Sequence, residues 1–411
     1  MYLKLLEKGI SYGRIILKLP NQETHQFGDS GPAITWIIHG QDTLKKIAHN
    51  WEFELGETYV NGEWDVEDDS LYTLISILRQ NFGIRKPPWP MRQMAKIRHA
   101  IRHRNPLHAS RKNVSHHYDL DGTLFSQFLD ENQIYSCAYF KDDDVDLDQA
   151  QRDKCQHIAR KLLLQPGQTV LDIGCGWGGF ALYLAQHFNV HVTGITLSRE
   201  QYQVARRRAR DAKLEDKLDF KLKDYRELDC QFDRVVSIGM FEHVGRDHYA
   251  TYFDKVASSL AEKGIALMHT IARTDRPRET NPWIEKYIFP GGYLPALSEI
   301  STAAETSALQ MTDIEILGGH YERTLAHWRQ RFLANRDRFS RLIDDRFCRM
   351  WEFYLASSEA AFRHTRIAVM QVQLARRRDA VPLTRDYMYQ AEPAFEQQGA
   401  GEKHIDYRGV G

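Results

Sequence analysis

The sequence predicts an α/β protein with a mostly parallel sheet, preceded by a smaller N-terminal α+β domain. From about residue 166 onward, short apolar runs alternate with helical patterns, which is the order of a parallel sheet covered on both faces. A glycine-rich turn follows the first of these runs, at residues 174–179. Because 411 residues exceed one ordinary compact domain, two domains are expected.

The amino-acid composition says more about the class of protein than about its binding partners. An apolar content of 42% is enough for real cores, whereas 55 basic and 55 acidic residues leave no net charge to indicate an anionic partner. The five cysteines lack the spacing of a disulfide framework or a zinc site, so we expect a reducing cytoplasm and no metal. No apolar run reaches the length of a membrane span, and charges interrupt the first ten residues, unlike a signal peptide.

Residues 1–84 are predicted to form the N-terminal domain. The runs RIILKLP and AITWIIH have strand-like spacing, and Asn61-Gly62 is predicted to be the turn of a hairpin between ETYV and EWDV. The segment LYTLISILRQN has helical spacing and is expected to end near Gly83.

Residues 85–116 are a basic linker with nine Lys/Arg and no acidic residue. Its middle, residues 91–101, is compatible with a short basic amphipathic helix. Two interpretations stay open: a solvated connector, or a surface that docks on anionic phosphate groups such as lipid headgroups. A nucleic-acid module is disfavoured because no recognition motif lies nearby.

Residues 117–379 are predicted to be the catalytic domain, and residues 380–411 a loosely ordered tail without periodicity. The expected strands, in order, are TVLDIG, VHVTGIT, LDFKLKD, FDRVVSIGM, GIALMHTIA and TDIEIL, most of them followed by a helical pattern.

The glycine-rich turn can hold a nucleotide-bearing cofactor, because glycine permits a tight turn and close approach of the backbone. The second strand ends at Thr196 and Ser198 without the carboxylate that a dinucleotide site requires. Asp172 ends the first strand, where it can meet a cationic amino group but would repel a pyrophosphate. These residues favour S-adenosylmethionine over a dinucleotide. Asp224 and Tyr225 follow the third strand, where an acid can bind the adenine amine and a ring can stack on it.

Three polar residues follow later strands of the predicted sheet. Glu242 follows the fourth strand, His269 ends the fifth, and Tyr321 follows the sixth. Each also has a structural interpretation: a helix N-terminal acid, a core histidine, or a packing tyrosine. Because ligands bind beyond the carboxyl ends of such strands, the three together predict a catalytic group that could hold a base or an anion. His243 lacks this support and is expected to face away, and residues 132–140 are either a hydrophobic cap or a lid over the cofactor.

Several motifs in order then resemble the cyclopropane fatty acid synthases, including the mycolic acid group, over roughly residues 117–378. The motifs are HYDLDGTLFSQFLDENQIYSCAYF, LDIGCGWGG, GITLSREQ, MFEHVG, KYIFPGGYLP and HYERTLAHW. WEFELGETYVNGEWDVED also resembles the extra N-terminal domain of members that act on phospholipids, so residues 1–84 are expected to bind lipid. The resemblance implies a Rossmann-like S-adenosylmethionine-dependent methyltransferase fold with a mostly parallel, seven-stranded sheet.

The implied reaction is methylene transfer to the cis double bond of an unsaturated acyl chain in a membrane phospholipid, closing a cyclopropane ring. In the family a bound bicarbonate ion removes the proton, and its ligands carry over to Cys137, Glu242, His269 and Tyr321. Cofactor contacts carry over to Tyr135, Ser136, Gly174, Gly176, Thr196, Leu197, Gln201 and Tyr225, in addition to Asp172 and Asp224 above. A homodimer at the anionic inner surface of the membrane is also implied.

The sequence leaves alternatives to ring closure on a phospholipid open. The same first step with loss of a different proton would give a methylene- or methyl-branched chain. A methyltransferase for a soluble acceptor and a lipid-binding protein without turnover are less favoured. Ser358 stands where some members have cysteine, so we expect altered sensitivity to thiol reagents and little effect on chemistry.

Overall fold

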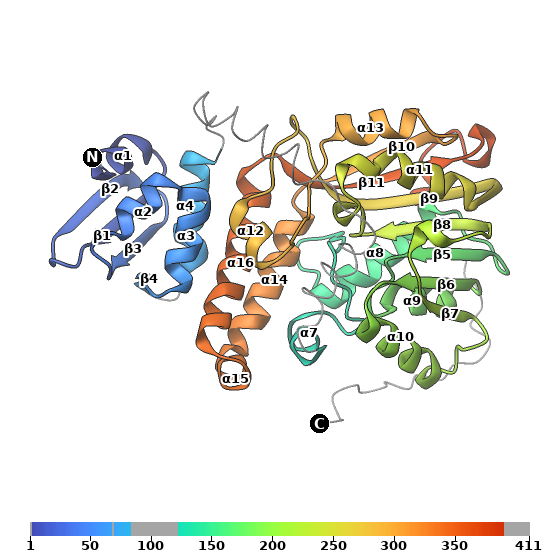
Figure 1. The fold of residues 1–411 in the computed structure, drawn as a ribbon, viewed down its shortest axis with the longest axis horizontal. Coiled ribbons are helices and arrows are strands. Elements are labelled where there is room, and N and C mark those ends of the chain that lie inside the picture. Colours follow the sequence, from blue (N-terminus) through green and yellow to red (C-terminus); the bar gives the residue numbers. More distant parts are fainter. Residues whose placement is uncertain (1, 68–69, 84–121, 390–411) are drawn as a thin grey trace.

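The computed structural model describes residues 2–67, 70–83 and 122–389. They form a small N-terminal lobe and a large α/β lobe, with the long helices α14 and α16 between them (Figure 1). The basic linker, with the helix predicted over residues 91–101, lies outside the described residues. Among the helices that are described, none is long and apolar enough to cross a bilayer.

The N-terminal lobe is a four-stranded sheet with the order β2-β1-β3-β4 and four helices. Alternate residues of β1 and β3, such as Ile15, Leu17 and Trp36, are buried, as the strand-like spacing predicts. The strands are β1 (Gly13–Lys18), β2 (Thr24–Ser30), β3 (Ala33–Ile38) and β4 (Trp64–Val66), and the helices are α1 (Tyr2–Gly9), α2 (Thr43–His49), α3 (Trp51–Val60) and α4 (Leu71–Phe82).

The first strand of the hairpin predicted around Asn61-Gly62 does not form. ETYV is the last turn of helix α3, and only the second side forms a strand, β4, which pairs antiparallel with β3. Leu55 and Tyr59, four residues apart, are buried on one face of α3. Burial of this face favours the helix over the hairpin that the local sequence predicts. Gly62 has φ +72°, so the turn itself still needs glycine.

The α/β lobe contains the predicted seven-stranded sheet, in the order β10-β11-β9-β8-β5-β6-β7. Strands β5 to β9 pair in parallel, and β11, which the sequence patterns did not single out, runs antiparallel between β9 and β10. The strands are β5 (Thr169–Ile173), β6 (His191–Thr196), β7 (Leu218–Leu222), β8 (Phe232–Ile238), β9 (Leu260–Arg273), β10 (Gln310–Leu317) and β11 (Ile367–Ala375).

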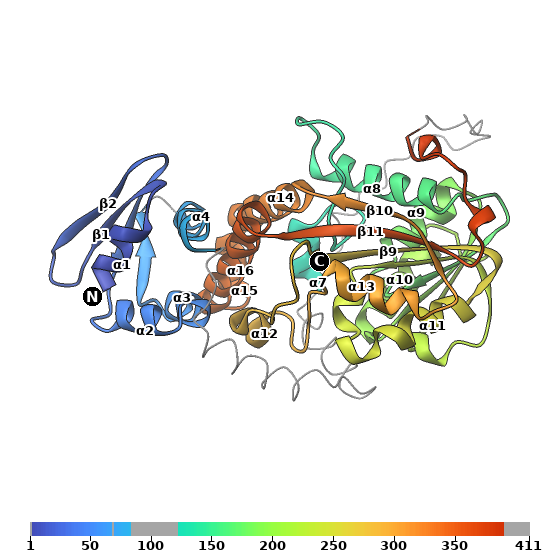
Figure 2. The ribbon, with the colours of Figure 1, turned by 90° about the horizontal axis from the view of Figure 1, so that it is seen from above.

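Helices cover both faces of this sheet. Figure 2 shows α8 and α9 on one side and α11 and α13 on the other, and each pair contributes to a separate buried apolar cluster. The helices of this lobe are α7 (Gly122–Phe128), α8 (Leu147–Lys161), α9 (Gly179–His187), α10 (Arg199–Asp211), α11 (Tyr249–Ser258), α12 (Pro282–Tyr287), α13 (Leu297–Glu305), α14 (His320–Ala334), α15 (Arg336–Leu342) and α16 (Asp345–His364), with short 3-10 turns η2 (Tyr225–Glu227), η3 (Phe241–His243), η4 (Arg246–His248), η5 (Arg378–Ala380) and η6 (Asp386–Met388).

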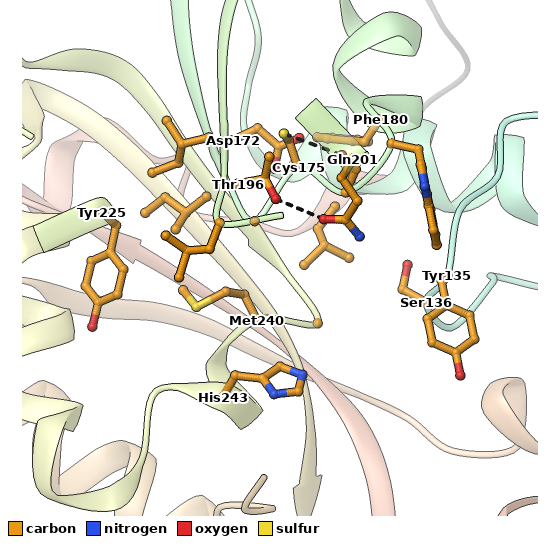
Figure 3. Close-up of a pocket in the computed structure, with 18 of the residues that line it drawn as sticks. Tyr135, Ser136, Asp172, Cys175, Phe180, Thr196, Gln201, Tyr225, Met240 and His243 are labelled. Carbon is orange, nitrogen blue, oxygen red and sulfur yellow. Dashed lines mark hydrogen bonds between the residues drawn. The ribbon is translucent and has the colours of Figure 1, made fainter. Parts of the chain in front are cut away.

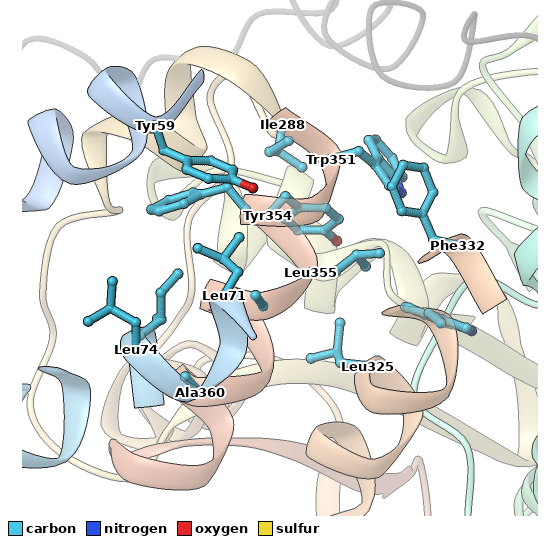
Figure 4. Packing of buried hydrophobic residues seen from close by; sticks show 14 of the residues in the cluster. Tyr59, Leu71, Leu74, Ile288, Leu325, Phe332, Trp351, Tyr354, Leu355 and Ala360 are labelled. Atoms are coloured by element: carbon cyan, nitrogen blue, oxygen red, sulfur yellow. The ribbon is translucent and has the colours of Figure 1, made fainter. Parts of the chain in front are cut away.

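Helix α16 joins the two lobes. Its outer face packs against Leu71 and Leu74 of α4 and Tyr59 of α3 in one apolar cluster (Figure 4). Polar contacts tie the same surfaces together: the Arg349 guanidinium donates to the carbonyl oxygen of Tyr59 at 2.7 Å, and the Tyr287 hydroxyl of α12 donates to Glu57 at 2.9 Å. The N-terminal lobe is therefore packed against the helix that also borders the catalytic lobe.

The predicted tail begins later than residue 380. Met388 is 2% exposed, and the Tyr387 hydroxyl accepts a hydrogen bond from the side-chain amide of Gln373 at 2.8 Å. Residues 381–389 thus contact the sheet and α8, because two apolar or aromatic side chains anchor a stretch whose composition alone looked loose. Residues 390–411 lie outside the described part of the chain.

Candidate active site

An open cavity of about 1280 Å³, counted to its solvent mouth, lies beyond the carboxyl ends of β5, β6, β7 and β8 (Figure 3). This is the position at which open α/β sheets bind their ligands. All ten residues predicted to contact the cofactor line it: Tyr135, Ser136, Asp172, Gly174, Gly176, Thr196, Leu197, Gln201, Asp224 and Tyr225.

The glycine-rich turn forms one wall of the cavity. Gly174 and Gly176 have φ angles of +82° and +55°, a region that favours glycine. A Cβ atom added to Gly176 would meet nothing within 4 Å, so this backbone borders open space where a ligand can approach closely. Cys175, between them, is buried, and burial raises the pKa of its thiol well above the usual range, which agrees with a packing role.

Asp172 lies at the base of the cavity. Its side chain is 2% exposed, and burial raises the pKa of its carboxyl to about 7, although the nearby Lys154 ammonium lowers it. A carboxylate in this position can pair with the ammonium group of an amino acid moiety, and it would repel a pyrophosphate. The residue therefore suits S-adenosylmethionine.

The end of β6 presents neutral hydrogen-bonding groups. The Thr196 hydroxyl donates to the side-chain oxygen of Gln201 at 2.9 Å, and Ser198 caps helix α10 by accepting from the Gln201 backbone N–H. Both Thr196 and Gln201 are thereby oriented by their own neighbours. The carboxylate that a dinucleotide requires at this position is replaced by hydroxyl and amide groups.

Asp224 and Tyr225 border the opposite wall, but the acid is already engaged. Its carboxylate accepts two hydrogen bonds from the Arg226 guanidinium, at 2.9 and 2.8 Å. Tyr225 is 8% exposed and meets Tyr252 edge-on, with ring centroids 5.7 Å apart. Any ligand that contacts Asp224 therefore meets a carboxylate that is already paired with Arg226.

Helix α8 holds the segment of Tyr135 and Ser136 against the cavity. The Gln151 side-chain amide donates to the carbonyl oxygens of Ile134 and Ser136, and the Lys154 ammonium donates to the Ser136 hydroxyl at 2.9 Å. Lys154 is fully buried and lines the cavity, although it was not among the predicted site residues. The signal was its spacing: Gln151 and Lys154 lie on the same helical face as the buried Leu147 and Ile158.

Glu242 and His269 are brought together at strand β9. One oxygen of Glu242 accepts from the Ile271 backbone N–H at 2.6 Å, two residues beyond His269, and the other is buried without a hydrogen-bond partner in the described part of the chain. Burial raises the pKa of the Glu242 carboxyl to about 7 and lowers that of the His269 imidazole well below its usual value. The amide nitrogen of Gln371 lies 3.2 Å from Nδ1 of His269, which places the ring proton on Nε2.

Cys137 and Tyr321 are brought near each other by a hydrogen bond between their neighbours in the chain. Thr324, one helical turn after Tyr321, accepts from the Ala138 backbone N–H at 3.0 Å, which fixes the chain beside Cys137. Burial raises the pKa of the Cys137 thiol to about 12, so its sulfur stays protonated. The four predicted catalytic residues thus form two pairs, and the Lys154 ammonium acts electrostatically on a member of each, Cys137 and His269.

Two sequence-based expectations about this region are wrong. His243 was expected to face away, but it lines the cavity because η3 turns its side chain back toward the mouth (Figure 3). His269 was placed at the end of the fifth strand, whereas β9 continues to Arg273. Pairing with β11 extends β9 past the point where its parallel neighbour β8 ends.

Comparison with known proteins agrees with this geometry. Residues 106–372 match the family model of mycolic acid cyclopropane synthetase. The cyclopropane-fatty-acyl-phospholipid synthase of Escherichia coli is 39% identical over 341 residues, which cover 82% of this chain and 87% of that protein. A probable fatty acid methyltransferase of Pseudomonas putida is 34% identical over 389 residues, covering 91% and 96%.

A solved structure agrees with the fold and the cofactor. The mycolic acid cyclopropane synthase CmaA1, complexed with SAH and CTAB, is 33% identical with a TM-score of 0.61, and the match covers 64% of this chain and 98% of that one. The family match spans more than half of the sequence and includes every strand-end residue discussed above. The chain therefore belongs to the mycolic acid cyclopropane synthetase family and is an S-adenosylmethionine-dependent methyltransferase.

Proposed function

We propose that the protein transfers a methylene group from S-adenosylmethionine to the cis double bond of unsaturated acyl chains in membrane phospholipids, forming a cyclopropane ring. The proposal rests mainly on one observation. The cofactor cavity, an aromatic wall and the buried residues Glu242 and His269 lie next to each other. The name of the E. coli relative supports the same substrate class.

The cavity residues account for binding and orientation of the cofactor. Asp172 would pair with its amino group, the Gly174–Gly176 backbone would approach its methionine portion, and Gln201 and Tyr225 would contact the nucleoside. When bound, S-adenosylmethionine supplies an electrophilic methyl group. Because an alkene is a weak nucleophile, fixed alignment of the two reactants contributes much of the acceleration.

An aromatic wall, to which helix α14 contributes Trp328, lies beside the cavity. Tyr135 stacks on Trp328 with ring centroids 4.9 Å apart, and Phe125 lies 4.8 Å from Trp177 and 5.2 Å from Tyr135. These rings offer an apolar surface to an acyl chain and π faces to positive charge that develops on it. They also exclude water, which would otherwise add to a carbocation.

The two buried pairs suit a bound base. Neutral His269 offers an N–H at Nε2, and the Glu242 carboxyl, with a pKa raised to about 7 by burial, can carry a proton on its unpartnered oxygen. Donors of this kind match the oxygens of bicarbonate, which would be held by Glu242, His269, Tyr321 and the backbone at Cys137. Bicarbonate would supply general-base chemistry at this position.

A second candidate shares the fold and the first step. The name of the Pseudomonas putida relative refers to a fatty acid methyltransferase, and loss of a different proton from the methylated chain would give a methylene- or methyl-branched product. Both outcomes use the same cofactor cavity, so the product decides between them.

The cellular setting is also a proposal. We infer a cytoplasmic homodimer, peripherally associated with the inner face of the membrane, whose residues 1–84 bind lipid and whose linker 85–116 contributes basic residues to that association. Replacing Arg98, Arg102 and Arg104 with Gln should weaken binding to anionic vesicles and leave cofactor affinity unchanged. Unchanged vesicle binding at low salt would remove the linker from the proposal.

The deciding experiment supplies vesicles of monounsaturated phospholipid and methyl-labelled S-adenosylmethionine, and identifies the acyl products by NMR. Upfield cyclopropane protons are expected. Vinylic or branched-methyl signals would assign the reaction to the second candidate, and the absence of label in lipid would refute both. Light scattering of the purified protein tests the homodimer in the same preparation.

A further inference from the structure

One edge of the molecule combines exposed arginines with exposed aliphatic side chains. Helices α7, α10 and α15 lie along the lower edge in Figure 1. Contacts connect them: the Arg338 guanidinium of α15 donates to Gln127 of α7 at 3.0 Å, and Arg208 of α10 donates to the Asn132 carbonyl just beyond α7. We call its exposed residues Arg207, Arg210, Arg338, Arg341, Leu342 and Ile343 the docking edge.

Leu342 and Ile343 are the apolar part of the docking edge. They are 61% and 45% exposed, and they are the only consecutive pair among the exposed large hydrophobic residues of the described chain. They stand at the turn between α15 and α16, where the preceding Phe339 is buried against Phe332. A rigid helical turn thus presents two aliphatic side chains to the outside.

The charges around this pair are mostly positive. Of the acids at the α15–α16 turn, Asp344 is occupied in capping α16 through the Phe347 backbone N–H, and Asp345 is paired with Arg336 at 2.8 Å. Asp211 and Asp337 are the exposed acids on α10 and α15. These two acids are outnumbered by the four arginines of the docking edge and by the exposed Arg199 and Arg206 of α10. The edge is therefore basic.

Behind the docking edge lies the aromatic wall of the site. Phe125 and Phe128 of α7 are buried and point inward, where Phe125 contacts Trp177, a residue that lines the cofactor cavity. Arg208 also donates to the Trp177 carbonyl at 3.0 Å. A single helix therefore separates the docking edge from the apolar surface that would receive an acyl chain.

We propose that the docking edge binds the surface of an anionic phospholipid bilayer, with Leu342 and Ile343 entering the boundary between headgroups and acyl chains. This rests on the proposed function, in which the substrate is a membrane lipid. The arginines match anionic headgroups, and aliphatic side chains flanked by arginines are the pattern of interfacial membrane binding. A second copy of the chain fits less well, because two-fold pairing would place the arginines of both copies against each other.

The first test measures binding of the full chain to vesicles of phosphatidylcholine with about one third phosphatidylglycerol, a composition chosen for its negative surface potential. The double variant Arg207→Glu/Arg341→Glu is expected to bind at least about tenfold more weakly, since each lost cation near such a surface costs roughly fivefold. Lys263→Glu/Arg378→Glu is the matched control, because it makes the same charge change with two exposed residues outside the docking edge, near the amino end of β9. Equal binding of the test and control variants would overturn the proposal.

The second test examines insertion of the aliphatic pair. Cys230 is the exposed cysteine among the five, and the others are buried, so Leu342→Cys in a Cys230→Ser background can be labelled selectively with an environment-sensitive dye. A blue shift of the dye emission is expected on addition of the anionic vesicles, with no shift for a dye at Lys263→Cys. An unshifted spectrum at position 342 would contradict insertion.

Two further measurements separate this proposal from the one it rests on. A short-chain monounsaturated phosphatidylcholine, dissolved as monomers, should be methylated equally by the wild type and the Arg207→Glu/Arg341→Glu variant, whereas turnover on vesicles should fall with binding. If no lipid is methylated, the proposed function fails while the vesicle-binding result stands by itself. If the docking-edge variants change the mass of the protein in solution, the edge is a contact between subunits and membrane docking is refuted.

Discussion

The cofactor cavity and the predicted anion site are built in different ways. The cavity takes most of its lining from the ends of parallel strands and the turns that follow, with Tyr135, Ser136 and Lys154 added from α8 and the segment before it, and it opens to solvent. The anion-site residues come from the interior of β9, from η3, from helix α14 and from the segment before α8, and all four are buried outside the lining of the cavity. The sheet topology therefore assembles most of the first site, whereas packing between distant segments assembles the second.

The largest effect is expected from a substitution of Glu242, which should lower turnover without changing cofactor binding. Glu242→Gln keeps the shape of the side chain and removes its acid, so turnover should fall by roughly 10²-fold or more, as for loss of an acid–base group. The dissociation constant of S-adenosylhomocysteine, measured by calorimetry, should stay within about twofold because the residue does not line the cavity. Near-normal turnover would remove Glu242 from the proton-transfer machinery.

A smaller effect is expected at Lys154, which links the two sites. Burial raises the pKa of the Asp172 carboxyl and the Lys154 ammonium lowers it, leaving it at about 7. In Lys154→Met the pKa rises further, so Asp172 is protonated at pH 7 and its hold on the cofactor's ammonium is lost. Affinity for S-adenosylhomocysteine should fall about tenfold at pH 7, equivalent to one unit of pKa, and recover toward pH 9.

The titratable groups that act on Lys154 are Asp130, Asp172, Cys137 and Cys155, all of which the variant leaves in place. Lys161→Met is the control, because Lys161 is a buried lysine on the same helix that pairs with Glu315 and does not line the cavity. Lys154→Gln can still donate to Ser136 but carries no charge. If Lys154→Gln shows the wild-type pH profile, the hydrogen bond to Ser136 matters and the charge does not.

A third prediction concerns the contact between the cavity and α16. The hydroxyl groups of Tyr135 and Tyr354 are 2.8 Å apart, and Tyr354 is buried. Tyr354→Phe should lower the free energy of unfolding by about 1 kcal/mol, the usual net value of one hydrogen bond, as measured in urea. Cofactor affinity should change less than threefold, roughly, since the Tyr135 ring keeps its stack on Trp328. A larger loss of affinity would mean that α16 positions the cavity wall.

The smallest effect is expected at Ser358, a partly buried residue on α16. Ser358→Cys exchanges one small side chain for another, so turnover should stay within about twofold. Inactivation by a thiol reagent should become faster than in the wild type, as followed by residual activity against time. Unchanged inactivation kinetics would show that a thiol at position 358 is not the reactive one.

The regular part of the fold followed from sequence patterns because parallel strands and their helices produce strong local signals. The six predicted strands and the cavity residues at their ends, such as Asp172, Thr196 and Asp224, depend on spacing and on the rule that ligands bind at strand ends. The seventh strand and the contacts of Tyr135, Ser136, Leu197 and Gln201 came from the family resemblance. The roles of the four anion-site residues came from family resemblance as well, and their shared function stays a prediction.

The features that the sequence did not reveal depend on contacts between distant segments. ETYV became helical because Leu55 and Tyr59 pack inside the N-terminal lobe. His243 turned toward the cavity through the geometry of η3, and the buried Lys154 looked like one more charged residue on a polar helix. In each case tertiary packing overrode a local pattern.

The packing of α16 against the N-terminal lobe limits how modular this enzyme can be. The solved relative matches 64% of this chain along nearly its whole length, so a family member can exist without a counterpart for the rest. In this chain the outer side of α16 carries Phe353, which meets Tyr59 and Trp283 at ring-centroid distances of 6.0 and 4.8 Å. Deleting residues 1–83 would uncover that apolar side and favour aggregation. We therefore expect relatives without the lobe to carry polar residues along the corresponding side of this helix.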